Sequence, residues 1–352
     1  MKKILFILIF SFIIQCVFAT EVFIWRQSPD SPMVLMPQKA NQSRAEAIDE
    51  YFKLIHKTPR VSKLLEQAEI RPLITNEGQL PYRRGEFVDI AQTKKTRIVI
   101  VTNELRELYG QPYSKRMANF KKRLEANGAE VFILPVMHDI TLNAQESKKY
   151  REKIIELFDA QLVMGGADID PYLYGEKVTF AKNINRARDV SELKFVKQFI
   201  KTKKGMNFGI CRGHQMCAVA HHKKLIQDIQ IIENADPIHI EGDHFVNYDK
   251  SSEIFSVFDE EKLYVNSLHH QAIVVPVNDK DYKVIATSLD KAPIVEAVEF
   301  KNGLGVTLQF HPELMHNETG DKIMKKYVQM ATSQKEKYYS KVSCQDLMKG
   351  FI

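Results

Sequence analysis

The chain has 352 residues, enough for one large domain with an extension or for two domains. Its composition, 44% hydrophobic and 27% charged without a low-complexity tract, excludes a chain that is mostly disordered. The formal net charge of +6 is mild, and the basic residues are scattered among acidic ones, so the sequence does not support a nucleic-acid-binding protein.

The first 19 residues are expected to be a secretory signal peptide. Lys2 and Lys3 form a basic start, an apolar run extends from Ile4 to Ile14, and Val17-Phe18-Ala19 places small residues at the usual cleavage position. The alternative is an uncleaved anchor, but residues 4–19 are short for a membrane span of about 20 residues. We therefore expect an exported protein, periplasmic or secreted, without stable membrane insertion after cleavage.

Cleavage of this peptide would leave three cysteines, namely Cys211, Cys217 and Cys344. A disulfide-stapled scaffold would have more cysteines and an even number of them, so at least one thiol is expected to stay free. A free thiol in an exported protein calls for a functional reason.

Residues 20–95 have weak periodicity and scattered prolines. One amphipathic helix is predicted there, from Ser43 to about His56. We interpret this region as an N-terminal extension whose role cannot be read from the sequence.

From Thr96 onward, predicted strands alternate with predicted helices. The strands are expected over 97–102, 130–135, 161–166 and 206–210, and the helices over 114–127, 144–158, 188–202 and from about 212. This alternation predicts an α/β fold with a mostly parallel central sheet and helices on both faces. Short strands are expected over about 226–310, a late core strand over 303–310, a closing helix over about 319–331 and a C-terminal tail over 336–352.

Cys211 stands where a predicted strand turns into a predicted helix, in the stretch GICRG. Gly209 and Gly213 flank it at two residues on either side, and small residues there relieve the crowding of a sharp turn. A helix N-terminus favours a thiolate. The alternative is a buried cysteine packed as a small hydrophobe. The position between strand and helix favours a nucleophile.

A cysteine nucleophile needs a base, and the base needs an orienting group. The stretch LQFHPE offers His311 and Glu313 at the end of another predicted strand. Residues two apart in an extended segment point the same way, so the carboxylate could hold the imidazole. The alternative, a surface turn, is open for this motif alone.

Oxyanion donors for acyl transfer are expected from two backbone amides. One is the amide of Arg212, just after the nucleophile, and the other is that of Gly166 or Gly165 in VMGGADIDP. The alternative for the two glycines is a plain turn.

The motifs GGADIDPYLYGE, GICRGHQ, VNSLHHQAI and QFHPE together resemble the class I glutamine amidotransferase-like superfamily. Within it they resemble the γ-glutamyl hydrolases of cysteine peptidase family C26, and most closely the γ-glutamyl-γ-aminobutyrate hydrolase type. The resemblance spans about residues 96–335. It implies a flavodoxin-like fold, a Cys211–His311–Glu313 triad and a small-molecule γ-glutamyl substrate that forms a thioester on Cys211.

The resemblance also implies substrate-binding residues. Gln215 matches the position that contacts the glutamyl group, and Ser267, His269 and His270 lie in a segment near the active site. Adjacent side chains in a strand diverge, so His269 and His270 suit a metal poorly. We therefore expect no metal and no cofactor.

Two further sets of residues have a structural alternative. Arg188, Asp189 and Glu192 resemble the Arg-Asp-x-x-Glu helix start of the family, but an Arg and a Glu four residues apart can also be a surface pair. Cys217 comes six residues after Cys211, faces another direction and is expected in the core.

The expected function is hydrolysis of a γ-glutamyl amide bond. The alternatives are a glutaminase subunit that supplies ammonia to a partner synthetase and a non-catalytic protein that binds a γ-glutamyl ligand. The usual family members are cytosolic, but exported folate-polyglutamate hydrolases of the same superfamily make export compatible with this chemistry. The sequence does not identify the leaving group, and it leaves a homodimer open.

Overall fold

The computed structural model describes residues 20–26, 33–57, 86–88, 94–102, 115–135, 137–232 and 239–349. The predicted signal peptide, residues 1–19, lies outside the described residues. The chain divides into two compact units. The larger is built from Lys94–Asn103, Ser114–Val131 and Phe158–Ile352, and the smaller from Met1–Thr93, Glu104–Tyr113 and Phe132–Leu157.

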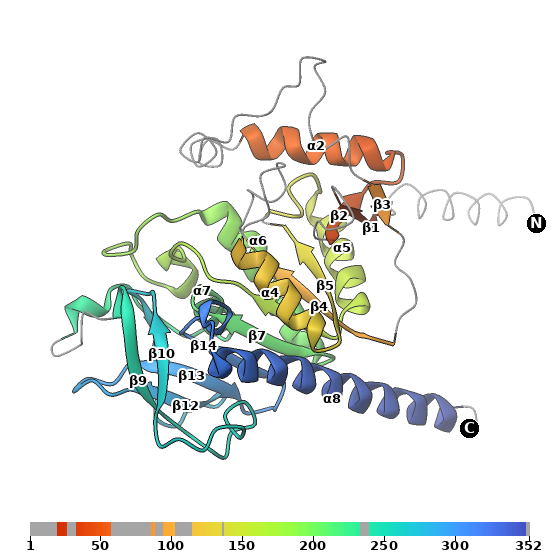
Figure 1. Cartoon of the computed structure of the whole chain (residues 1–352). Coiled ribbons are helices and arrows are strands. Elements are labelled where there is room, and N and C mark those ends of the chain that lie inside the picture. Colours follow the sequence, from red (N-terminus) through yellow and green to blue (C-terminus); the bar gives the residue numbers. More distant parts are fainter. Residues whose placement is uncertain are drawn as a thin grey trace, which may run out of the picture. The chain divides into compact units, whose positions relative to one another are not determined.

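The sheet of the larger unit has a parallel core and an antiparallel extension (Figure 1). The parallel strands are, in sheet order, β14 (Gly305–Leu308), β7 (Met206–Ile210), β6 (Ala160–Val163) and β4 (Thr96–Val101). The antiparallel strands, continuing outward from β14, are β13 (Val295–Phe300), β12 (Tyr282–Ser288), β9 (Gly242–Tyr248) and β10 (Leu263–Ser267). The predicted α/β fold with a mostly parallel core is confirmed.

Short elements complete the strands of the larger unit. A two-stranded sheet joins β8 (Leu225–Ile226) to β11 (Ala272–Ile273). Three 3₁₀ turns follow strand ends or loops, namely η3 (Pro171–Tyr174), η4 (Ile229–Ile231) and η6 (Pro312–Leu314).

Helices cover both faces of the parallel core. They are α4 (Lys115–Ala126), α6 (Arg186–Thr202), α7 (Arg212–Ala220) and α8 (Glu318–Lys349). Figure 1 shows α4 and α8 together on one face, with α6 and α7 on the other. Right-handed crossovers explain this arrangement. The chain passes from β4 through α4 toward one edge of the sheet, and from β6 through α6 to β7 toward the other edge, so the two helices lie on opposite faces. The parallel strands are consequently buried on both faces, and Ile98, Val99 and Phe208 are fully buried.

The closing helix α8 runs to Lys349, so its predicted end near Ala331 was wrong. The apolar pattern fades after Ala331, which is why the sequence pattern stopped there. The residues that follow are mostly good helix formers, and the next Gly or Pro is Gly350. Propensity and the lack of a stop signal therefore extend the helix beyond its buried part.

The smaller unit contains strands that the sequence did not predict. β1 (Glu21–Arg26) pairs antiparallel with β2 (Met33–Gln38) and with β3 (Glu86–Val88), and β2 pairs parallel with the end of β5 (Ala129–Leu134). These strands are short, and scattered prolines in the region obscured their pattern.

Capping boxes begin two helices in the described part of the smaller unit, α2 (Arg44–Lys57) and α5 (Ala144–Leu157). Before α2, the Ser43 N–H donates to Glu46 (2.7 Å) and the Glu46 N–H donates to Ser43 Oγ (3.2 Å). The predicted helix over 43–56 is confirmed. Among the described residues, no helix combines the length and the apolarity that crossing a bilayer requires.

Candidate active site

Cys211 occupies a strained turn between β7 and α7. Its φ of 52° and ψ of −111° lie outside the regions that L-residues commonly adopt. A Cβ on Gly209 would stand 2.6 Å from the Gly213 oxygen, and a Cβ on Gly213 would stand 1.9 Å from the Val163 oxygen. The predicted strand-to-helix turn is therefore present, and both flanking positions have room only for glycine. The Cys211 side chain is free of disulfide bonds and 7% exposed.

His311 and Glu313 follow strand β14, which neighbours β7 in the sheet. His311 Nδ1 lies 2.7 Å from Glu313 Oε1, and both side chains are buried. Burial lowers the pKa of the His311 imidazole, but the charges of Glu313 and Cys211, with hydrogen bonds to both, outweigh it and raise that pKa to about 10. The structure therefore brings Cys211, His311 and Glu313 together, with the imidazole hydrogen-bonded to both of the other side chains.

Asn266 holds the backbone of His311 and was missed in the sequence. The His311 N–H donates to Asn266 Oδ1 (2.8 Å), and Asn266 Nδ2 donates to the His311 carbonyl oxygen (3.0 Å). Two residues further on, the Leu268 carbonyl oxygen lies 3.9 Å from Cys211 Sγ. One segment thus contacts both the Cys211 thiol and the backbone of His311. The motif VNSLHHQAI indicates this segment, but nothing in the motif identifies Asn266 as the residue that holds His311.

The two expected oxyanion donors follow adjacent parallel strands. Gly166 follows β6 and Arg212 begins α7 after β7, and these strands pair with Val163 opposite Gly209. The first N–H groups of a helix have no partner within the helix, so the Arg212 amide is available to an anion. Gly166 has a φ of +153°, and a Cβ there would stand 2.8 Å from Arg188 Nη1. The positive φ, together with the close packing on Arg188, favours a glycine at this position.

The Arg-Asp-x-x-Glu residues at the start of α6 form a buried network, so the alternative of a surface pair was wrong. Arg212 Nη2 lies 2.5 Å from Asp189 Oδ1, and Arg212 Nη1 lies 2.5 Å from Glu192 Oε2. Arg188 lies 3.4 Å from the same Glu192 oxygen, and the Asp170 N–H donates to Asp189 (3.0 Å). These groups tie the residue after Cys211 to the loop that follows Gly166.

Gln215 and Ser267 are buried and bonded to other protein groups. Gln215 Nε2 donates to the Gln271 carbonyl oxygen and to Gln309 Oε1, both at 3.2 Å. The Ser267 hydroxyl donates to the His239 carbonyl oxygen (2.9 Å). Gln215 lies on the first turns of α7 beside Cys211, whereas Ser267 is turned toward His239.

His269 and His270 diverge as expected for adjacent residues. His270 Nε2 lies 3.0 Å from Asp168 Oδ2, and this hydrogen bond outweighs burial and raises the pKa of His270. His269 turns inward, where its Nδ1 lies 2.9 Å from the Gln271 carbonyl oxygen and its Nε2 faces Glu296. The two rings therefore do not share a site.

Cys217 lies in the core, as predicted. Its thiol is fully buried and free, and burial raises its pKa far above the ordinary value. This thiol is therefore not a candidate nucleophile.

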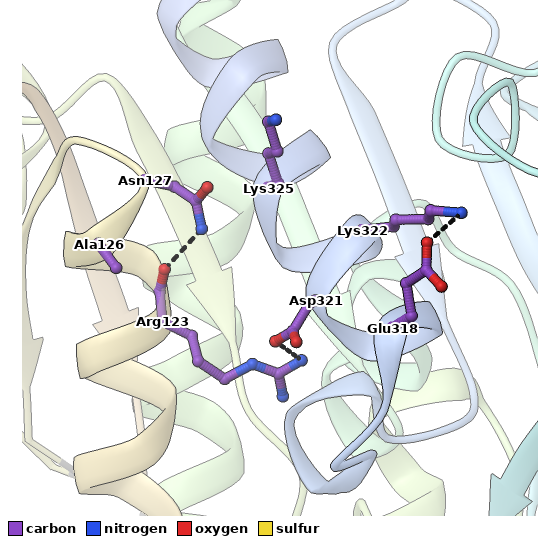
Figure 2. A pocket seen from close by; sticks show the side chains of 7 residues that line it. All are labelled: Arg123, Ala126, Asn127, Glu318, Asp321, Lys322 and Lys325. Atoms are coloured by element: carbon purple, nitrogen blue, oxygen red, sulfur yellow. Dashed lines mark hydrogen bonds and ion pairs between the residues drawn. The ribbon is translucent and has the colours of Figure 1, made fainter.

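A hollow of about 250 Å³ lies between α4 and α8 (Figure 2). Its lining is mostly charged and consists of Arg123, Ala126, Asn127, Glu318, Asp321, Lys322 and Lys325. Figure 2 shows Arg123 turned toward Asp321, and the two side chains are 2.8 Å apart. Arg123 Nη1 also donates to the Pro312 carbonyl oxygen (2.9 Å), so it supports the turn that carries His311 and Glu313. The expected site residues do not line this hollow.

One family model and several known proteins match this chain. A family model described as peptidase C26 matches residues 101–313. The glutamine amidotransferase-like protein YvdE of Lactococcus lactis subsp. lactis is 33% identical over 195 residues, which cover 53% of this chain and 75% of that protein. One of the subunits of the glutamine-hydrolysing GMP synthase of Ignicoccus hospitalis is 27% identical over 143 residues, 41% of this chain and 69% of that protein.

A solved structure gives a further likeness. The glutaminase domain of CTPS from Trypanosoma brucei with bound acivicin has a TM-score of 0.49 and 15% identity. The match covers 68% of this chain and 94% of that domain.

Proposed function

Because the chain belongs to the peptidase C26 family, we propose that it hydrolyses a γ-glutamyl amide bond through a thioester on Cys211. The observation that carries this proposal is the contact of a strained thiol with His311, whose ring is paired with Glu313. A nucleophile, a base and a group that orients the base are what covalent acyl transfer needs.

In the acylation step, Cys211 Sγ attacks the γ-carbonyl carbon of the substrate. The carbonyl electrons move to the oxygen, which accepts hydrogen bonds from the amides of Arg212 and Gly166. One such donor typically contributes about 3 kcal/mol to the stabilisation of a transition state. The C–N bond then breaks, and the leaving amine takes a proton from the His311 imidazolium.

In the deacylation step, His311 is neutral and accepts a proton from water. The resulting hydroxide attacks the thioester carbon, the C–S bond breaks, and glutamate leaves. The Cys211 thiolate and the His311 imidazolium are restored. Glu313 stabilises the imidazolium in both steps and fixes the ring, because its carboxylate is bound to Nδ1.

Recognition of the γ-glutamyl group is assigned in this proposal to side chains beside the thiol. Gln215 lies on α7 within the motif that carries Cys211. The His270–Asp168 pair joins the VNSLHHQAI and GGADIDP segments, and the hydrogen bond to Asp168 raises the pKa of the ring. Both groups are polar or charged, as recognition of an amino-acid head group requires.

The proposal is tested by measuring glutamate release from a panel of γ-glutamyl amides, with intact mass spectrometry to detect an acyl adduct. Wild-type protein should release glutamate and carry a transient adduct, while a folded Cys211→Ala variant should do neither. Turnover retained in Cys211→Ala would overturn the mechanism. Titration of the Cys211 thiol before the assay verifies that an inactive wild-type preparation is not simply oxidised.

The alternative is a glutaminase that passes ammonia to a partner. It is favoured by the similarity to a component of glutamine-hydrolysing GMP synthase. The same three residues could release ammonia from glutamine, so the panel includes glutamine. Glutamine as the sole substrate, with activity that rises when a synthetase copurifies, would favour this alternative over a self-contained hydrolase.

We also propose that the chain is exported, on the basis of the basic start and apolar run in residues 1–19. Fractionation of cells that express the full chain should place it outside the cytoplasm, and N-terminal sequencing should find Thr20 first. A chain in the cytosolic fraction that still begins at Met1 would contradict export.

A further inference from the structure

A buried carboxylate lies among three histidines in the antiparallel part of the larger unit. Glu296, on β13, is fully buried. Its Oε1 lies 3.3 Å from His244 Nε2, 3.5 Å from His239 Nδ1 and 3.7 Å from His269 Nε2. Among the described residues, neither oxygen of Glu296 has a hydrogen-bond partner. A buried carboxylate without a close partner is costly, so this arrangement needs an explanation.

The outer hydrogen bonds of two of the rings determine which atoms face Glu296. His269 Nδ1 lies 2.9 Å from the Gln271 carbonyl oxygen, which can only accept, so this nitrogen carries the proton. His239 Nε2 lies 2.7 Å from Asp290 Oδ2, and in the neutral ring it likewise carries the proton. The atoms that face Glu296, His239 Nδ1 and His269 Nε2, then present lone pairs. Ser267 Oγ lies 3.5 Å from His239 Nδ1, but its single hydroxyl proton is donated to the His239 carbonyl oxygen (2.9 Å), so none remains for Nδ1.

Two lone pairs and a carboxylate oxygen that converge on one point repel one another unless a cation lies between them. Protonated rings would solve this by closing on the carboxylate, at the roughly 2.7–2.9 Å typical of a charge-assisted hydrogen bond. The observed 3.5 and 3.7 Å are too long for such bonds. They are closer to the distances between donor atoms around a tetrahedral ion. With metal–ligand bonds of about 2.0–2.1 Å, two such donor atoms lie about 3.3 Å apart.

We propose that His239 Nδ1, His269 Nε2 and Glu296 Oε1 bind a divalent transition-metal ion of the Zn²⁺ type. These three atoms lie within 4.8 Å of one another, and all three residues are buried. Two imidazoles and one carboxylate are a donor set for Zn²⁺ or Co²⁺ rather than for Mg²⁺ or Ca²⁺. His244 Nε2 lies 3.3 Å from the same carboxylate oxygen but outside this group of three, so it is a neighbour of the site and the fourth position is left to a water molecule.

The outer contacts of the ligands support a metal site rather than a chance cluster. Metal-bound histidines usually donate their other ring N–H to a carboxylate or to a backbone carbonyl. The Asp290 carboxylate accepts the outer N–H of His239, and the Gln271 carbonyl oxygen accepts the outer N–H of His269. Each outer contact fixes the tautomer that a ligand needs.

The site lies on the segment that contacts the catalytic residues. His269 follows Leu268, whose carbonyl oxygen lies against Cys211 Sγ, and it comes three residues after Asn266, which holds His311. An ion on His269 would tie this segment to Glu296 on β13 and to His239. We infer a positioning ion that fixes the wall facing the thiol and takes no part in bond breaking.

The test uses the full chain, stripped of metal with a chelator and then titrated with Zn²⁺ by calorimetry and with Co²⁺ by visible absorption. Wild type should bind a single ion per chain, and the Co²⁺ form should have the intense d–d bands of a tetrahedral site. Glu296→Gln keeps the size of the side chain and removes its charge, so its affinity should fall roughly 100-fold or more. Asp290→Asn, which alters an outer contact, should lose about 10-fold to 100-fold.

His270→Gln is the matched control, because it removes a neighbouring imidazole that is turned toward Asp168. Its metal affinity should equal that of wild type. Wild-type protein that takes up neither ion, or Glu296→Gln that binds as tightly as wild type, would overturn the proposal. The wild-type titration does not depend on the folding of any variant, and circular dichroism of each variant separates lost affinity from lost structure.

Discussion

The side-chain amide of Asn266 bonds to both backbone polar groups of His311. It accepts from the His311 N–H at 2.8 Å and donates to the His311 carbonyl at 3.0 Å. His311 stands at the start of a short 3₁₀ turn, where few regular backbone bonds hold it. The position of the imidazole that we propose as the base therefore depends on a residue from β10, 45 positions away in the chain.

Asn266→Ala should lower kcat by about 10-fold to 100-fold, because a small displacement of the base is costly to the reaction. The contact between Glu313 and His311 remains in this variant, so the dependence of kcat on pH should keep its wild-type shape. Steady-state kinetics against pH measure both effects. Asn247→Ala, an exposed asparagine on β9, is the matched control, and equal losses in the two variants would contradict a positioning role.

The pH profile should depend on Glu313. The pKa of His311 is raised from 6.5 to about 10, so the imidazolium that protonates the leaving amine persists through neutral pH and is lost as pH rises toward 10. In Glu313→Gln the largest of the raising charges is gone, and the alkaline limb of kcat/KM should move down by about 1 to 3 pH units. Glu318→Gln, an exposed control on α8, should leave that limb in place, and a limb unchanged in Glu313→Gln would refute the assignment.

The buried charges behind the nucleophile should matter for stability. Asp189→Asn leaves the buried Arg212 guanidinium with one carboxylate fewer, and loss of one partner of a buried pair costs about 3 kcal/mol or more. Urea unfolding measures the free energy of unfolding. The control is Glu125→Gln, which removes the partly exposed pair with Lys121 and should cost about 0.5 kcal/mol. Similar losses in both would show that burial of the network adds nothing.

The turn at Cys211 should not tolerate a methyl group at Gly213. A Cβ there would stand 1.9 Å from the Val163 oxygen, which belongs to the backbone of β6 and cannot move aside cheaply. Gly213→Ala should therefore abolish activity and lower the melting temperature strongly. Gly303→Ala is the control, because Gly303 has a φ of +73° with open space around it and should cost only about 1 kcal/mol. Wild-type activity in Gly213→Ala would contradict the packing.

Cys211 and Cys217, both buried, should differ in reactivity. Cys211 is 7% exposed at a helix N-terminus and should be alkylated by iodoacetamide at neutral pH, whereas Cys217 is fully buried and its raised pKa keeps it a thiol. Peptide mapping after brief alkylation distinguishes them. Equal labelling of both cysteines in folded protein would contradict this difference.

Much of the fold was predictable from local patterns. The parallel strands β4, β6 and β7 are short apolar runs that alternate with helical periodicity, and burial on both faces produces such runs. β1 and β2 were not predicted because their stabilisation comes from pairing with each other and with β5, which a local pattern does not encode. The end of α8 was missed because the sequence after Ala331 lacks a regular apolar stripe.

The candidate catalytic residues were predictable because each has a local signal. Cys211 has its two glycines, and His311 and Glu313 share one short motif. The contacts around them were not predictable in this way. His239 and Glu296 are 57 positions apart and meet only when β9, β10 and β13 assemble, so the reasoning from adjacent histidines could not find them.

The contact between Gly213 and the Val163 carbonyl also bears on how such a chain can evolve. Backbone meets backbone there, so the thiol and the Gly166 loop that follows β6 are interlocked, and neither can be reshaped by substitution without disturbing the other. Substitutions that change the leaving group are therefore expected in segments outside this contact, so that the turn can stay the same while the substrate changes.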